Sequence, residues 1–192
     1  PNQNNYIATG VTYETPPLHL DNVRWNDVTL SAGTFIVTPN EDPEKQHLGV
    51  DICPTSDNID FANDENGGIE IYPSVYGIVT KVVDGCKPLQ ESESCSKYGN
   101  HVEIKTILNT DPPEEGTSYY LTRYAFLREG ITVNVDDSIQ RGEVGPGGGN
   151  KVIGIMGNSG LSKSTHLHFE IKRGVKQEGK IVEHYLNPAE FL

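Results

Sequence analysis

The feature that most constrains the fold is a succession of short apolar or alternating segments separated by turn-forming residues. The chain contains 20 glycines and 12 prolines, and no long stretch repeats apolar residues at helical spacing. Short runs bounded by Gly, Pro, Asn and Asp are typical of β-strands. The pattern predicts an all-β, antiparallel fold with at most a short helical turn near residues 187–191, where Asn187 precedes Pro188.

Several segments have the composition and length of strands. The turn-rich sequence NTDPPEEGT separates two of them, residues 101–108 and 118–127, which we expect to form a long hairpin. The other predicted strands are residues 33–37, 68–72, 77–83, 151–156 and 165–173.

The length of 192 residues suits one domain, or one domain with an N-terminal extension. Residues 1–32 are weakly patterned, and we interpret them as an N-terminal extension that packs on the edge of a domain formed by residues 33–192. The alternative is that residues 1–32 cover the active site.

Charge and hydropathy exclude several classes of partner. The formal charge of −12 argues against nucleic acid and anionic membranes as partners, because phosphate affinity comes from clustered Lys and Arg. No apolar run approaches the roughly 20 residues needed to span a bilayer, so we expect no membrane insertion. We expect a monomer that is extracytoplasmic or secreted, with a signal peptide or anchor removed ahead of Pro1.

Three cysteines bear on the compartment. Cys86 and Cys95 flank the polar segment KPLQESES, and a local disulfide between them would suit an oxidising environment; reduced thiols are the alternative. Cys53 would then be left over as a small buried residue. Because Cys53 follows Asp51 by two residues, a role as a metal ligand is the second interpretation.

Two compact groups of residues carry the candidate chemistry. The first joins His47 and Asp51 in HLGVD, and the second contains His166 and His168 in THLHFE. Side chains two apart in a strand share a face, so His166 and His168 would project together. Two histidines at this spacing in a strand are more commonly just two surface residues. Zinc gives them a shared function, because a catalytic site takes three nitrogen or oxygen ligands and leaves one position open.

Six segments, in order, resemble the lysostaphin-like (LytM-type) zinc metallopeptidases, which are peptidoglycan endopeptidases. Together these segments span most of residues 33–192. They are QHLGVDI (46–52), GIEIYPSVYGIVTKV (68–82), YGNHVEI (98–104), VNVDDSIQRGEV (133–144), GIMGNSGLSKSTHLHFE (154–170) and YLNPAEFL (185–192). In the fourth segment Asp136 replaces the family's usual glycine.

The resemblance implies the family's antiparallel β-sheet fold and one zinc ion bound by His47, Asp51 and His168. It implies His166 as a catalytic histidine that assists water in attacking a peptide bond. The implied substrate is a peptide of the bacterial cell wall, often one containing glycine. The alternative is a non-catalytic zinc module that binds a wall peptide or a protein partner.

One position departs from the family pattern. Where the family has a second catalytic histidine in a Tyr-Ala-His-Leu strand, this chain has Phe126, which cannot donate a hydrogen bond or move a proton. Activity is therefore expected to be reduced or absent, since such a group contributes about 10²- to 10⁴-fold in rate. If Asn100 lies opposite Phe126, His101 points away from zinc, whereas a register shift or bulge would let His101 substitute. His19 is a further conceivable donor, and His184 is expected to be structural or exposed.

Overall fold

The computed structural model describes residues 28–30, 47–54, 68–90, 92–107, 116–140 and 151–190. The predicted strand 33–37 and His19 lie outside these residues, as does most of the proposed extension. No helix in the described part is long and apolar enough to cross a membrane.

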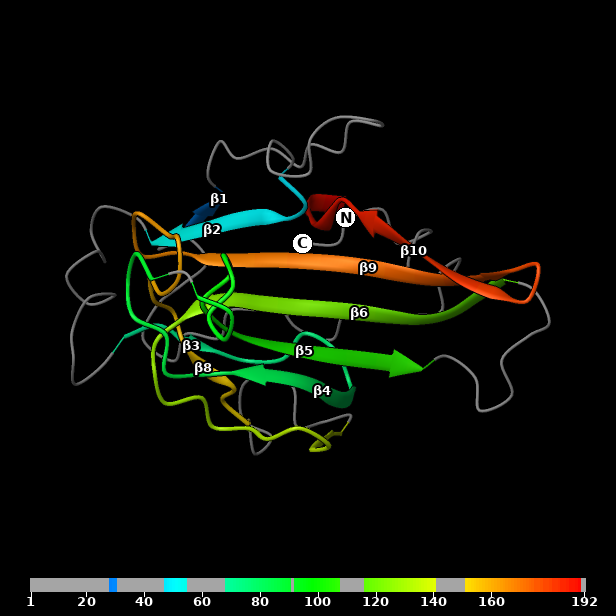
Figure 1. Ribbon diagram of the computed structural model, residues 1–192, viewed down its shortest axis with the longest axis horizontal. Helices are drawn as coiled ribbons and strands as arrows, with labels where there is room; N and C mark the ends of the chain where they lie inside the picture. Colours follow the sequence, from blue (N-terminus) through cyan, green and yellow to red (C-terminus); the bar gives the residue numbers. More distant parts are fainter. Residues whose placement is uncertain are drawn as a thin grey trace.

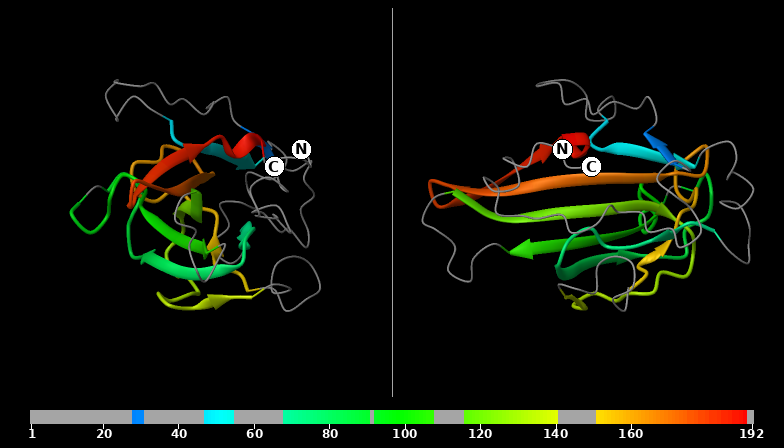
Figure 2. Two further views of the ribbon diagram at one scale, coloured as in Figure 1. Left: turned by 90° about the vertical axis from the view of Figure 1, so that its right-hand side faces the viewer. Right: turned by 180° about the vertical axis from the view of Figure 1, so that it is seen from behind.

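The described residues form two antiparallel sheets, as the sequence predicts. The larger sheet has eight strands in the order β1-β2-β9-β6-β5-β4-β7, with β10 paired to β9, and the smaller sheet pairs β3 with β8. In Figure 1 the large sheet is seen with β2, β9, β6, β5 and β4 side by side, and the end-on view of Figure 2 shows that this sheet is curved. The strands are β1 (Val28–Leu30), β2 (Val50–Pro54), β3 (Glu70–Ile71), β4 (Gly77–Val83), β5 (Asn100–Ile107), β6 (Gly116–Leu127), β7 (Ser138–Ile139), β8 (Gly154–Ile155), β9 (Leu167–Gln177) and β10 (Lys180–Leu186).

The predicted all-β class and the long hairpin are confirmed. β5 and β6 pair antiparallel along most of their length, and the only helix in the described residues is the 3-10 turn Pro188–Glu190. β10 was not predicted, because it lies on β9 with its side chains mostly exposed and lacks an apolar pattern. β1, from the proposed extension, pairs with β2 at the edge of the sheet.

One face of the large sheet is packed into the core. Alternate residues of β9 that face it are fully buried: Leu167, Phe169 and Ile171. The smaller sheet adds Ile71 to the same hydrophobic cluster. Because side chains alternate along a strand, the residues between these apolar positions lie on the opposite face.

That opposite face carries the candidate chemistry. Asp51 pairs with His168, which pairs with Ala125, which pairs with His101, so these four residues form a row across β2, β9, β6 and β5. The register of the sheet therefore brings Asp51 beside His168, although 117 positions separate them in sequence.

Cys86 and Cys95 form a disulfide in the structure, with their Cα atoms 5.6 Å apart. Cys53 takes no part in that disulfide; it lies on β2 and is half-buried rather than fully buried.

Candidate metal centre

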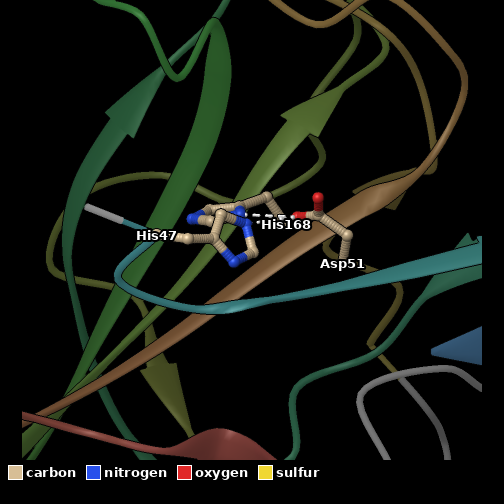
Figure 3. A group of neighbouring side chains, drawn as sticks. All are labelled: His47, Asp51 and His168. Carbon is tan, nitrogen blue, oxygen red and sulfur yellow. Dashed lines mark hydrogen bonds and ion pairs between the residues drawn. The ribbon is translucent and has the colours of Figure 1, made fainter. Parts of the chain in front are cut away.

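Three side chains from two distant segments converge at one end of the large sheet. His47 lies just before β2, Asp51 lies on β2 and His168 lies on β9 (Figure 3). One nitrogen or oxygen atom of each lies within 4.8 Å of the others. Cys53, for which a ligand role was the alternative, does not belong to this group.

The carboxylate of Asp51 is the centre of this cluster. Its Oδ1 lies 2.7 Å from His168 Nδ1 and 3.2 Å from His47 Nε2. Ligand atoms in a tetrahedral zinc site with bonds of 2.0–2.2 Å lie about 3.3 Å apart. The cluster is therefore compact enough to be spanned by a single ion.

The bonding of the two histidines tests whether a cation fits. His168 Nε2 lies 3.1 Å from Glu170 Oε1. When Nε2–H donates to Glu170, a neutral His168 directs the lone pair of Nδ1 at Asp51. A lone pair and a carboxylate oxygen that face each other require a proton or a cation between them. Among the residues that the structure describes, His47 Nδ1 is buried without a hydrogen-bond partner. The residues present therefore fit a divalent cation with nitrogen and oxygen ligands.

The two carboxylates at the cluster are held in their ionised form. Burial would raise the pKa of Asp51, but its hydrogen bonds with His168 and His47 hold that pKa well below its usual range. Against the effect of burial, Asp51 and Glu170 raise the pKa of His168, so without an ion a proton on Nδ1 stands between His168 and Asp51. Burial would likewise raise the pKa of Glu170, yet His168 and the positive charge of Arg123 hold it below its ordinary value. Both carboxylates are ionised at neutral pH.

His166 lies beside the cluster with one nitrogen already engaged. Its Nδ1 lies 2.9 Å from the carbonyl oxygen of Ser164, to which Nδ1–H donates, and 3.2 Å from Ser162 Oγ. This bond leaves Nε2 as the acceptor, 3.6 Å from Asp51 Oδ1. Burial lowers the pKa of His166, partly opposed by the charge of Asp51, so the ring is neutral at pH 7 and able to accept a proton.

Phe126 occupies a bulge at the end of β6. Asn100 pairs with Leu127 and His101 pairs with Ala125, which leaves Phe126 without a partner residue on β5. Its backbone has a φ of 63°, and its N–H donates to the carbonyl of Tyr98. The ring lies edge-on to His166 at a centroid distance of 4.9 Å.

The register that placed Asn100 opposite Phe126 is wrong, because the bulge shifts the pairing by one residue. His101 consequently shares the face of His168, the alternative that the sequence left open. His101 is nevertheless buried behind Tyr98, whose ring centroid lies 6.1 Å from that of His101 and 5.8 Å from that of His168. His101 does not line the pocket over the cluster. His184 is exposed on β10, as expected.

A buried charged network that was not predicted from the sequence supports His168 from behind. Arg123 forms ion pairs with both Glu103 and Glu170. Glu170 in turn contacts His168, so the network extends to that histidine. The guanidinium carbon of Arg123 also lies 4.2 Å from the centre of the Tyr98 ring. The three charged residues could be seen in the sequences of their strands, but only the strand register shows that they lie side by side on one face.

A pocket of about 390 Å³ opens over the cluster. Its walls combine the proposed catalytic residues with apolar, hydroxyl and basic side chains from three loops. The lining residues are His47, Leu48, Asp51, Lys97, Tyr98, Phe126, Leu161, Ser162, Lys163, Ser164, His166, His168 and Glu170.

The sequence matches the family described as peptidase family M23 over residues 55–182. The chain belongs to peptidase family M23. The match covers two-thirds of this M23 chain and includes His166 and His168, but it begins after His47 and Asp51. The resemblance to LytM-type peptidases is thereby confirmed.

Solved structures are similar to this M23 chain at low identity. A protein described as a glycyl-glycine endopeptidase, LytM, from Ruminococcus gnavus is 17% identical, with a TM-score of 0.56 over 94% of this chain and 59% of its own. Lysostaphin from Staphylococcus simulans is 20% identical, with a TM-score of 0.49 over 88% of this chain and 51% of its own. A zinc-containing peptidase from Vibrio cholerae is 21% identical, with a TM-score of 0.44 over 81% of this chain and 35% of its own.

The M23 chain thus spans between about a third and three-fifths of the length of these three proteins. The Ruminococcus structure supports the shared fold. A search of curated proteins found no match.

Proposed function

We propose that this M23 chain is a zinc-dependent endopeptidase that hydrolyses peptide bonds of the bacterial cell wall outside the cytoplasm. The observation that carries the proposal is the convergence of His47, Asp51 and His168 within 4.8 Å at the base of an open pocket. Membership of a peptidase family supports the reaction class. The disulfide between Cys86 and Cys95 supports an oxidising compartment.

In this proposal His47, Asp51 and His168 hold the ion, and Glu170 orients His168 by accepting its Nε2–H. Zinc held there would polarise the scissile carbonyl and acidify a water molecule. His166 presents its Nε2 lone pair to the same space, because Ser164 engages Nδ1. His166 thereby accepts the proton of the attacking water and returns it to the leaving amine.

A second candidate function is favoured by Phe126. Its ring lies against His166 and against His168, with centroid distances of 4.9 and 5.6 Å, and it supplies no donor for a developing oxyanion. An M23 chain with this substitution could keep zinc and use the pocket to bind a wall peptide without cleaving it. The ordered ligand set and the neutral His166 favour the enzyme.

The two functions are separated by comparing three proteins in parallel. Zinc content is measured first, and cleavage of purified peptidoglycan and of glycine peptides is then assayed for the native chain, Phe126→His and His166→Ala. The enzyme proposal expects one zinc per chain, native cleavage, a loss of about 10²- to 10⁴-fold in His166→Ala and a gain in Phe126→His.

Cleavage by Phe126→His alone would identify the native chain as a binding module. A chain that binds no zinc would overturn both functions. If neither the native chain nor Phe126→His cleaves any of these substrates, the endopeptidase proposal fails.

A further inference from the structure

Two lysines stand at the pocket over the metal cluster of a chain whose charge is otherwise strongly negative. The sequence has 27 acidic and 15 basic residues, yet Lys97 and Lys163 both line this pocket. They come from the loops on either side of it, before β5 and before β9. Both side chains are exposed.

The other charged residues of the pocket lining are already engaged. Asp51 contacts His47, His166 and His168, and Glu170 contacts His168 and Arg123. Within the described residues neither lysine has an ion-pair partner, and Lys97 instead lies with its Nζ 5.2 Å from the centre of the Tyr98 ring. The pocket therefore presents two cations with unused hydrogen-bond donors to whatever enters it.

The other residues of the pocket wall restrict which ligands can reach the two lysines. Leu48 and Phe126 give the pocket an apolar side, and Leu161, which is 43% exposed, lies two residues before Lys163. A glycine chain has no side chain to cover these apolar groups and no charge for the lysines. A peptide side chain that carries a carboxylate on a short aliphatic stem near the scissile bond would cover the apolar groups and pair with the lysines.

We infer that the pocket selects peptides bearing a free carboxylate beside the scissile bond, with Lys97 and Lys163 as the specificity-determining residues. The inference rests on the proposed function for the position of the scissile bond. It concerns binding, however, and is tested without cleavage. The overall charge of −12 supports this preference, because an acidic peptide is repelled by most of the surface and attracted only where cations lie.

The test uses the full chain loaded with zinc and two capped peptides, Ala-Ala-Glu-Ala-Ala and its Gln counterpart, which differ by one charge. Dissociation constants are measured by NMR titration for the native chain, Lys97→Gln, Lys163→Gln and the double variant. We expect the Glu peptide to bind more tightly, and the double variant to lose about three- to tenfold of that preference. Raising the ionic strength should reduce the preference in the native chain.

Lys180→Gln is the matched control. It removes the same charge from the start of β10, where Lys180 pairs with Gln177; at about 3.3 Å per strand residue this position lies about 30 Å along β9 from His168. Figure 1 shows the hairpin of β9 and β10 at one end of the large sheet. The inference is overturned if neither peptide binds, if both bind equally, or if the preference survives in the double variant, because the carboxylate would then be bound by the metal alone. Equal loss in Lys180→Gln would also overturn it, since the effect would come from net charge.

Cleavage is recorded separately, so the two proposals can fail independently. A native chain that prefers the Glu peptide but cleaves nothing retains the specificity and loses the endopeptidase function. A chain that cleaves glycine peptides and shows no preference for carboxylate retains the function and loses the specificity.

Discussion

At the scale of single residues, the centre depends on which nitrogen of His168 faces Asp51. Glu170 Oε1 lies 3.1 Å from Nε2, and Glu170 is 1% exposed, so it has no solvent to replace that contact. Arg123 contacts the other oxygen of the same carboxylate and keeps it ionised. Glu170 therefore holds His168 in the tautomer that presents Nδ1 to the proposed ion.

We predict that Glu170→Gln weakens zinc affinity by about tenfold or more, because the neutral amide holds His168 less firmly. Affinity is measured by competition with a chromophoric chelator. Glu103→Gln is the control, since Glu103 also contacts Arg123 but has no contact with His168. Equal zinc affinity in the two variants would contradict the orienting role of Glu170.

At the scale of elements, the loop that carries His166 is fixed by a close approach between two glycines. A Cβ on Gly160, whose φ is 66°, would lie 2.4 Å from the backbone nitrogen of Gly99. The neighbouring bonds from Gly160 N–H to Lys87 and from Leu161 N–H to Lys97 tie this loop to the segments before β5. Any residue larger than glycine at 160 must push these segments apart.

We predict that Gly160→Ala lowers the free energy of unfolding by about 1–3 kcal/mol more than Gly179→Ala does. Gly179 has a similar φ of 74° with nothing near its missing Cβ, so it reports the backbone cost alone, about 1 kcal/mol. Urea denaturation measures both variants. Similar losses would show that the contact with Gly99 relaxes at little cost.

The disulfide closes a surface loop at the same end of the sheet. Cys86 N–H donates to Asn100 Oδ1, and Asn100 Nδ2 donates to the carbonyl of Cys86, so the loop is anchored to the start of β5. We predict that replacing Cys86 and Cys95 together by serine lowers the free energy of unfolding by about 2–3 kcal/mol, as expected for closing a short loop. A native protein whose urea midpoint is unchanged by reducing agent would contradict this.

At the scale of the whole molecule, the large sheet has one apolar face and one face on which buried charges are paired. Arg123 joins β5 to β9 through Glu103 and Glu170. Because the folded state lowers the pKa of Glu170 below its ordinary value of 4.5, the unfolded chain binds its proton more readily. The carboxylate therefore stabilises the fold above about pH 4.5, and this contribution is lost as the pH falls through the lower, folded value.

We predict that metal-free native protein and metal-free Glu170→Gln differ most in free energy of unfolding at pH 7. The difference should shrink as the pH is lowered below 4.5, the ordinary pKa of this group. Urea denaturation at a series of pH values measures it. A difference that does not change with pH would show that Glu170 acts through packing rather than charge.

The strand class, the long hairpin and the shared face of His166 and His168 could be predicted from the sequence alone, and the resemblance to LytM-type peptidases added His47, Asp51 and His168 as candidate ligands. These features are local: turn residues bound each strand, and a period of two places His166 and His168 together. The net charge and the order of the motifs could likewise be obtained without a structure.

Which distant residues meet depends on how the strands pair, and this could not be predicted from the sequence. The pairing of β2 with β9 puts Asp51 beside His168, and the bulge in β6 determines where Phe126 and His101 point. The Arg123 network and the pocket with Lys97 and Lys163 follow from the same register. A bulge inserts one residue and reverses the face of every residue beyond it, so no local pattern in the sequence could have given these contacts.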